Sequence, residues 1–264
     1  DDPMLVQYFS YLKGILQGDL GTSIAYFPEP VSAIIGSGLY WTLFLAGCSL
    51  VISFTIGTVL GIIIAWNRTG KMDTILPPLI AFFGAFPYFW LAMVLLYIFG
   101  FSMNWFPVGR AYGNEVNPGF SISFLLSVLY HAILPAFTMI FVSLGGWMLS
   151  MRNTMISTLG ADYITFANAK GIPSRQVMLR YAARNAILPN LTGFGMALGF
   201  VLSGALLTEM IFSYPGQGFL LLQAVQTQDY PLMQGIFMTI TLAVLGANWL
   251  VDIAILLFDP RTRK

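Results

Sequence analysis

Long apolar runs dominate the chain, and short stretches with charged or turn-forming residues separate them. A helix needs roughly 20 apolar residues to cross a bilayer core of about 30 Å. Five runs reach that length, at residues 39–66, 74–101, 123–150, 190–212 and 232–258. They are continuous, unlike the alternating segments of a membrane β-barrel. The pattern therefore predicts an all-α, polytopic transmembrane helical bundle with five spans in this chain.

Charged residues are scarce. The 264 residues include 12 Lys+Arg and 11 Asp+Glu, so that 9% are charged, against about 25% in an ordinary soluble domain. Hydrophobic residues make up 57% of the chain, and the mean hydropathy is +0.78. This composition excludes a soluble enzyme, a disordered segment and a nucleic-acid-binding protein. Because Cys48 is the single cysteine, it also excludes an intrachain disulfide and a cysteine-based metal site.

The placement of the basic residues predicts an orientation. Ten Lys and Arg residues follow the first, third and fifth runs, whereas Lys13 and Arg110 lie in the other segments. The positive-inside rule places the ten in the cytoplasm. We therefore expect an extracytoplasmic segment at 1–38 with a helix over 4–16, a transmembrane domain at 39–258 and a cytoplasmic tail at 259–264. Because a start outside needs a preceding helix, an earlier span is expected before Asp1.

The inner segment 151–189 is predicted to contain two short helices that meet at a corner. Gly171 suits the left-handed position that ends a helix, and Pro173 suits the first turn of the next one. Beyond the corner, Gln176, Arg180 and Arg184 recur at four-residue spacing and form a cationic face. Two interpretations fit such an amphipathic element: an anchor on anionic lipid, or a docking helix for a cytoplasmic partner.

This segment resembles the coupling loop, or EAA loop, of ABC-importer permeases. The similarity lies in the stretches 162–163 (Asp-Tyr), 167–171 (Ala-Asn-Ala-Lys-Gly) and 184–189 (Arg-Asn-Ala-Ile-Leu-Pro). The spacing is typical of the B-type permease of the dipeptide/oligopeptide family, although Asn168 and Tyr181 replace an Arg and a His that are frequent there. The resemblance assigns coupling to an ATPase to the following residues: Asp162, Tyr163, Ala167, Ala169, Lys170, Gly171, Pro173, Arg175, Arg180, Arg184, Asn185 and Pro189.

Other stretches along nearly the whole chain are similar to the same family, in the same order. They include 18–23 (Gly-Asp-Leu-Gly-Thr-Ser), 212–218 (Phe-Ser-Tyr-Pro-Gly-Gln-Gly) and 259–261 (Asp-Pro-Arg). The resemblance implies the type I ABC-importer permease fold, with six spans in a complete subunit of a bacterial or archaeal cytoplasmic membrane. It also implies the partners: a second homologous permease subunit, two ATPase subunits or domains, an extracytoplasmic solute-binding protein and the lipid bilayer.

The sequence contains no Walker A motif of the form GxxxxGK[ST]. ATP and Mg are therefore expected on partner subunits, and this chain is expected to be neither an enzyme nor a binder of a cofactor or metal. The resemblance implies ATP-driven import by alternating access, with peptides as the expected solute. Oligosaccharides or nickel are alternatives for the same fold. An ion-coupled secondary transporter and a membrane-embedded enzyme or scaffold are more remote, because neither internal repeats nor a catalytic set of residues is evident.

Interrupted and polar positions within the runs supply further candidates. A helix that Pro87 opens at mid-membrane must be lined by protein or water, so Phe86, Pro87 and Phe89 are predicted to lie in the translocation path. Glu209 is expected either to line an outer gate with Tyr214 or to cap the turn at 214–216.

Structural roles are predicted for three more polar residues. His131 is expected to form a helix–helix hydrogen bond. Asn248 and Asp252 share a helix face, and Asp252 is expected to pair with a cytoplasmic Arg.

Overall fold

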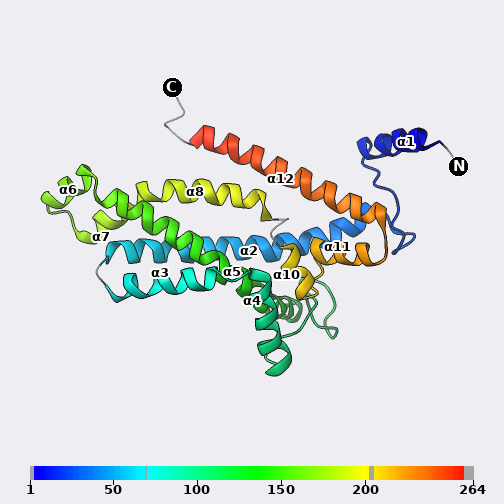
Figure 1. Ribbon diagram of the computed structural model, residues 1–264, viewed down its shortest axis with the longest axis horizontal. Helices are drawn as coiled ribbons and strands as arrows, with labels where there is room; N and C mark the ends of the chain where they lie inside the picture. Colours follow the sequence, from blue (N-terminus) through cyan, green and yellow to red (C-terminus); the bar gives the residue numbers. More distant parts are fainter. Residues whose placement is uncertain (1–2, 69, 202–204, 259–264) are drawn as a thin grey trace.

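A computed structural model describes residues 3–68, 70–201 and 205–258, and helices account for its regular secondary structure apart from one bridge between Thr22 and Pro30. The all-α class is thus confirmed for these residues (Figure 1). The elements are α1 (Met4–Leu16), α2 (Val31–Trp66), α3 (Lys71–Gly84), α4 (Tyr88–Leu95), η1 (Leu96–Ser102), α5 (Ile122–Leu159), α6 (Asp162–Ala169), α7 (Ser174–Gln176), η2 (Val177–Ala183), α8 (Arg184–Gly199), α10 (Leu206–Ile211), α11 (Gln217–Gln226) and α12 (Tyr230–Phe258).

Three of these helices are long and apolar enough to cross a membrane: α2, α5 and α12. The second predicted span is divided between α3 and the helix formed by α4 and η1, which are bent by 92° relative to each other and count together as a fourth candidate. The fourth predicted span, 190–212, is not a single helix, because α8 ends at Gly199 and α10 begins at Leu206. The expected count of five spans is therefore not confirmed in the described residues.

Several helix ends differ from the predicted boundaries. α1 covers residues 4–16 as expected, but α2 begins at Val31, so the predicted boundary at residue 38 lies inside a helix. α5 continues to Leu159, so its last turns lie within the predicted inner loop 151–189. Apolar runs locate the membrane core, whereas helices continue beyond it until a capping or turn residue ends them.

α2 and α5 form the closest helix pair, and glycines allow their approach. A Cβ on Gly57 would lie 2.9 Å from the carbonyl oxygen of Leu144, and one on Gly61 would lie 2.7 Å from that of Met148. Gly57 and Gly61 are four residues apart, the spacing of the small residues that bring membrane helices together. This pair is the central scaffold on which α3, α6 and α8 pack.

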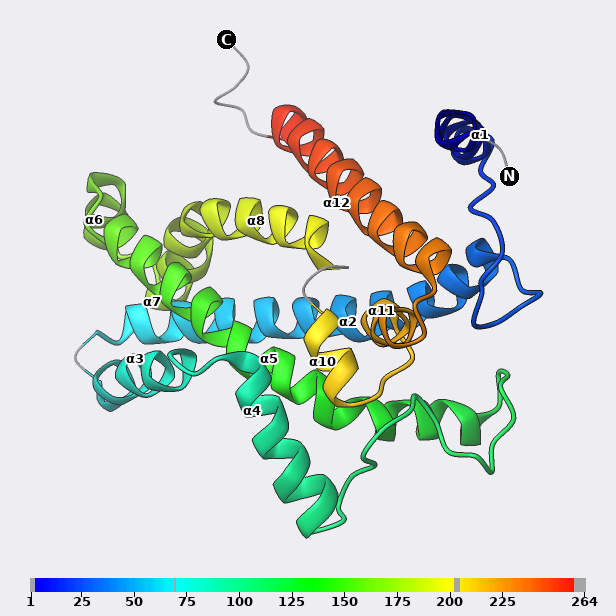
Figure 2. The ribbon, with the colours of Figure 1, turned by 45° about the vertical axis from the view of Figure 1, so that its right-hand side comes forward.

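The buried apolar residues form clusters at the two ends of the molecule and between them. One core lies at the end that carries the predicted coupling loop, and we name it the coupling-end core for that reason. It joins α2, α5, α6, η2 and α8, and its buried members are Ala65, Met151, Met155, Ile164, Ala167, Val177, Ala182, Ala183 and Ala186. The far-end core joins α2, α11 and α12, and its members are Val31, Ile35, Leu220, Leu221, Ala224, Leu232 and Ile236. A middle core lies around Leu45, Ala92 and Phe212. Figures 1 and 2 show α6 and α7 at the end of the molecule opposite to α1 and α11.

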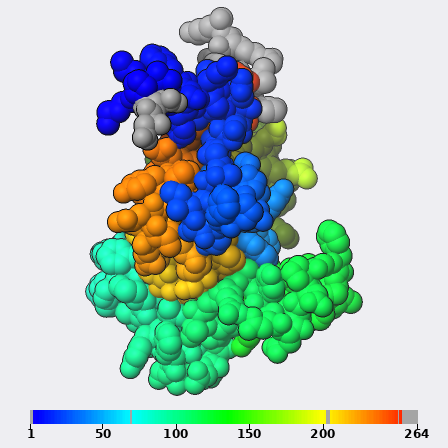
Figure 3. Space-filling model, turned by 90° about the vertical axis from the view of Figure 1, so that its right-hand side faces the viewer, coloured from blue at the N-terminus to red at the C-terminus, as the bar shows by residue number. Residues whose placement is uncertain are grey.

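The segment between α1 and α2 is fixed to the far end by Asp229, a carboxylate with no exposed surface. Asp229 accepts hydrogen bonds from the Ser23 hydroxyl and from the N–H groups of Ile24 and Ala25, both at 3.0 Å. It also accepts one from Leu232 N–H at 3.1 Å, which caps the first turn of α12. Figure 3 shows the blue residues at the beginning of α2 packed beside the orange residues of α11 and α12.

Candidate functional site: the coupling corner and the bent helix

α6 is an amphipathic helix whose two faces have different surroundings. Ile164 and Ala167 are buried in the coupling-end core. On the other face, the rings of Tyr163 and Phe166 are 41% and 61% exposed. Because the core holds the buried face in place, the aromatic face is presented to the surroundings in a fixed orientation. The sequence predicted Asp162, Tyr163, Ala167 and Ala169 here; the structure exposes all of them except Ala167.

The predicted corner after α6 is a Schellman turn. Gly171 has φ +72°, the left-handed region that glycine adopts without strain. The N–H of Ile172 donates to the Ala167 carbonyl at 3.3 Å, and the N–H of Gly171 donates to the Asn168 carbonyl at 3.0 Å. Pro173 is the residue that precedes α7, one position earlier than predicted. The corner thus ends α6 with the carbonyls of Ala167 and Asn168 satisfied.

Asn185 ties α6 to the beginning of α8. Its amide nitrogen Nδ2 donates to the Tyr163 hydroxyl at 3.1 Å and to the Tyr181 carbonyl at 3.0 Å. On the other side of α6, the Lys170 ammonium lies 4.5 Å from the centroid of the Phe166 ring, a cation–π contact. Each exposed aromatic ring of α6 is therefore contacted by a residue that the sequence assigned to the coupling loop: Tyr163 by Asn185 and Phe166 by Lys170.

Two shallow hollows flank the corner. Asp162, Tyr163, Thr165, Phe166 and Ala169 line the first. The second is lined by residues that follow the corner: Pro173, Arg175, Gln176, Leu179 and Arg180. Arg180 and Arg184 are exposed, as the predicted cationic face requires, and neither forms an ion pair with a described residue. Pro189 lies inside α8, beyond the corner.

The bend between α3 and α4 borders a partly open cavity of about 240 Å³. Pro87 precedes α4 with an extended backbone, at φ −57° and ψ 130°. Tyr88, next to it, lines the cavity, whereas the predicted path residues Phe86 and Phe89 do not. Phe86 stacks on Trp90 with the ring centroids 5.1 Å apart.

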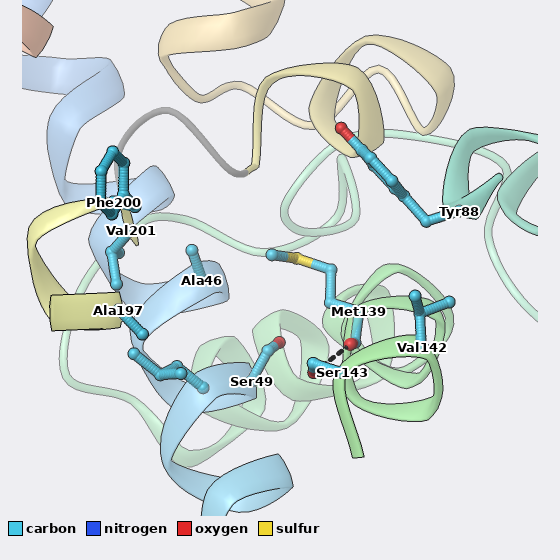
Figure 4. Close-up of a pocket in the computed structure, with 10 residues that line it drawn as sticks. Ala46, Ser49, Tyr88, Met139, Val142, Ser143, Ala197, Phe200 and Val201 are labelled. Atoms are coloured by element: carbon cyan, nitrogen blue, oxygen red, sulfur yellow. Dashed lines mark hydrogen bonds between the residues drawn. The ribbon is translucent and has the colours of Figure 1, made fainter. Parts of the chain in front are cut away.

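The walls of this cavity come from four helices and are mostly apolar (Figure 4). Its lining residues are Ala46, Ser49, Leu50, Tyr88, Met139, Val142, Ser143, Ala197, Phe200 and Val201. The hydroxyls of Ser49 and Ser143 are bonded within their own helices, to the Leu45 and Met139 carbonyls. Neither hydroxyl group is therefore an unsatisfied polar group of the wall.

Glu209 caps the first turn of α11, which follows the turn at 214–216 named in one of its two predicted roles. Its Oε2 accepts a hydrogen bond from Gly218 N–H at 2.7 Å, and it has no exposed surface. A Cβ on Gly216 would overlap the Glu209 carboxylate, so the turn needs glycine there. Tyr214 is also fully buried, and its ring meets Trp41 of α2 edge-on at 6.0 Å. These contacts fix the turn between α10 and α11.

The three predicted structural polar residues have different outcomes. His131 Nδ1 lies 2.8 Å from the Ser127 carbonyl of its own helix, and the expected helix–helix bond stays a prediction. The Asn248 side chain of α12 packs directly on Gly199 of α8, so that a Cβ on Gly199 would overlap Asn248 Oδ1. Asp252 is exposed and forms no ion pair with a described residue. The arginines of the predicted tail 259–264 lie outside the described residues.

Asn190 is a buried residue whose role sequence reasoning missed. Its Nδ2 donates to the Trp147 carbonyl at 3.2 Å, and its Oδ1 accepts from the Ser150 hydroxyl at 2.5 Å. Asn190 Nδ2 also donates to the Thr58 hydroxyl of α2 at 3.5 Å, so this single amide joins α8 to α5 and α2. An amide at the edge of an apolar run is the signal that was available.

The long apolar helices are those of a multi-pass membrane protein, and the exposed aromatic face of α6 lies at one end of it. Residues 57–264 match the sequence model of a family described as binding-protein-dependent transport system inner membrane component, and the chain belongs to this family.

Relatives of the chain carry names that agree with this family. A protein of Brucella suis named as a peptide permease is 35% identical over 263 residues, which cover 100% of this chain and 81% of the relative. The oligopeptide transport system permease protein AppB of Bacillus subtilis is 32% identical, with coverage of 99% and 81%. The dipeptide transport system permease protein DppB of Escherichia coli is 33% identical, with coverage of 100% and 82%. The predicted family is thus confirmed: the chain is a permease subunit of a binding-protein-dependent ABC importer.

Proposed function

We propose that this chain imports peptides, as the names of its relatives indicate for them, by alternating access to the two sides of a cytoplasmic membrane. A second homologous permease subunit completes the pathway, and an extracytoplasmic solute-binding protein delivers the solute. Two ATPase subunits or domains bind ATP and Mg. Oligosaccharides or nickel are the alternative solutes, but no described feature of the chain favours them.

The observation that carries the proposal is the rigid display of Tyr163 and Phe166 on α6. A coupling element must transmit force. The face that points to the rest of its own subunit must therefore be packed, and the face that meets the ATPase must be exposed. α6 meets both requirements, because Ile164 and Ala167 are buried and the two rings are exposed. The hollow lined by the two rings and the second hollow after the corner offer space for side chains of the ATPase. An anchor on lipid needs no such fixed orientation.

The proposed orientation places the coupling corner in the cytoplasm. Lys170, Arg175, Arg180 and Arg184 lie at or near this corner, and positive charge accumulates on the cytoplasmic side of membrane proteins. The segment held by Asp229 then faces outward, toward the binding protein. We place the translocation path beside the bend, where Tyr88 borders the cavity, and keep Glu209 and Tyr214 as the frame of an outer gate.

Substitution of Gly171 tests the coupling role. Gly171→Val introduces a β-branched residue at φ +72° and distorts the corner without a clash, since nothing lies within 4 Å of the added Cβ. In the reconstituted complex, we expect solute uptake to fall by about tenfold or more relative to ATP hydrolysis, a loss within the usual range of coupling free energies. Unchanged uptake per ATP would contradict the proposal.

Gly18→Val is the matched control, because Gly18 also has positive φ (+82°) and open space but lies at the opposite end. It is expected to retain normal coupling. The solute is tested separately, by calorimetric binding of a peptide library, an oligosaccharide panel and Ni²⁺ to the solute-binding protein of the same system. Binding of oligosaccharide or Ni²⁺ in place of peptide would replace the proposed solute.

A further inference from the structure

α3 is held on α5 by three contacts that follow one stripe of each helix. The helices run antiparallel, and the pairs are Asp73 with Arg152, Ile80 with Gly145, and Phe83 with Phe141. The partners on α3 are seven and three residues apart, and those on α5 are seven and four apart. Both spacings return to the same face of a helix. α3 therefore rests along a single line of α5.

The three contacts differ in strength and in kind. A Cβ on Gly145 would overlap Ile80, so α3 fits closely at the middle pair. The rings of Phe83 and Phe141 meet at 5.4 Å and 74°, an edge-to-face contact. At the remaining pair, Arg152 Nε lies 2.6 Å from Asp73 Oδ1, and the two side chains are 23% and 12% exposed. Within residues 3–68, 70–201 and 205–258 this is the single salt bridge.

The same segment of α5 also carries α6. Met151 and Met155, on either side of Arg152 along the helix, are fully buried in the coupling-end core with Ile164 and Ala167 of α6. The contacts of α6 and α3 with α5 are thus less than one helical turn apart. The salt bridge is therefore the contact of α3 nearest to the part of α5 that packs against α6.

The opposite end of α3 leads to the bend. α3 ends at Gly84, the chain turns by 92°, and Tyr88 begins α4 at the wall of the cavity. Met72, Ile75, Leu79 and Phe82, on the outer face of α3, are exposed. Since the described contacts of α3 lie mainly on α5, these contacts decide whether the bend follows the coupling end.

We propose that Asp73 and Arg152 are positioning residues that make α3 move with the coupling end of α5 during the ATP-driven cycle, and so transmit that movement to the bend before Tyr88. The proposal rests on the proposed function, in which α6 is the docking element for the ATPase.

Cysteine labelling on α3 tests the transmission. Cys48 is exposed and is first replaced in Cys48→Ala, so that it does not react. Because the Met72 side chain is 43% exposed, Met72→Cys then reports on the beginning of α3. Its reaction rate with a maleimide is measured in the reconstituted complex, without nucleotide and after trapping with ATP and vanadate. We expect the two rates to differ by about fivefold or more, the lower range of allosteric coupling. Asp73→Asn and Arg152→Gln should each reduce this difference to less than about twofold.

The exchanged pair Asp73→Arg with Arg152→Asp separates transmission from a general loss of structure. It is expected to restore more than half of the difference in labelling rate between the nucleotide-free complex and the complex trapped with ATP and vanadate. Lys71→Gln, in the first turn of α3 and without an ion pair to a described residue, is the matched control and should behave as the parent. An unchanged labelling difference in both single variants would overturn the proposal, and so would an exchanged pair that fails to restore it.

Co-purification of the ATPase subunits is measured first for every variant. Normal co-purification in Asp73→Asn together with a lost labelling difference supports the proposal. If the parent complex itself holds no ATPase, or if Gly171→Val leaves coupling intact, the proposed function fails instead, which is a different result from unaltered labelling in the salt-bridge variants.

Discussion

Asp229 shows how one buried carboxylate organises a segment more than 200 positions away along the chain. Burial by itself would raise the pKa of its carboxyl, but hydrogen bonds from Ser23, Ala25, Leu232 and Ile24 outweigh burial and hold the pKa below its ordinary value. The charged form is therefore the one that the fold stabilises. Its contribution is fully present above the unfolded-state pKa of about 3.9, and it is lost as the pH falls through the lower folded-state value.

Asp229→Asn is expected to destabilise the folded chain by about 1–3 kcal/mol at pH 7, because an amide replaces an acceptor of several hydrogen bonds. The thermal unfolding midpoint of the detergent-purified protein measures this loss, and the difference from the parent should shrink below about pH 4. Asp19→Asn is the control, since Asp19 is exposed and accepts a single local bond from Gly21. Equal midpoints for parent and Asp229→Asn at pH 7 would contradict this account.

At the scale of elements, the α2–α5 pair depends on the absence of side chains at Gly57 and Gly61. A Cβ on Gly61 would come within 2.7 Å of both the Met148 carbonyl oxygen and the Met151 Cβ. The first is backbone, which cannot rotate away. Close packing of this kind replaces the hydrophobic effect as the force between helices in lipid.

Gly61→Ala is therefore expected to destabilise the chain by about 1–3 kcal/mol through overpacking. Gly47→Ala, on the same helix and with nothing within 4 Å, should be neutral or stabilising by up to about 1 kcal/mol, because alanine favours the helix. The comparison is made by thermal unfolding in detergent. A smaller effect at Gly61 than at Gly47 would show that the pair separates easily.

The limits of sequence reasoning also lie at the scale of elements. α2, α5 and α12 were predictable because hydropathy is local, and so was the corner at Gly171, whose turn involves only its neighbours. The end of α8 at Gly199, inside the apolar run 190–212, was not predictable, because neither a charge nor a proline marks it in the sequence. The pair Asp73–Arg152 is separated by 79 positions, and its charges resemble ordinary loop charges in the sequence. Its partnership comes from the tertiary approach of α3 to α5.

For the whole molecule, separate cores at the two ends imply separate responses to partners. The coupling-end core contains the buried face of α6, whereas the far-end core contains residues of α11 and α12. Hydrogen exchange on the membrane complex tests this. Binding of the ATPase should protect amides at 162–185 by about tenfold or more, and those at 18–30 should change little. Protection confined to 18–30 would contradict the proposed docking end.

The length of α5 has a mechanical consequence. At about 1.5 Å per residue, its 38 residues extend over about 57 Å, nearly twice the roughly 30 Å of a bilayer core. A tilt of about 10° about one end of such a helix moves the other end by about 10 Å at this rise. A small change of tilt at the far end of α5 is therefore a displacement of about 10 Å at the end that carries the corner.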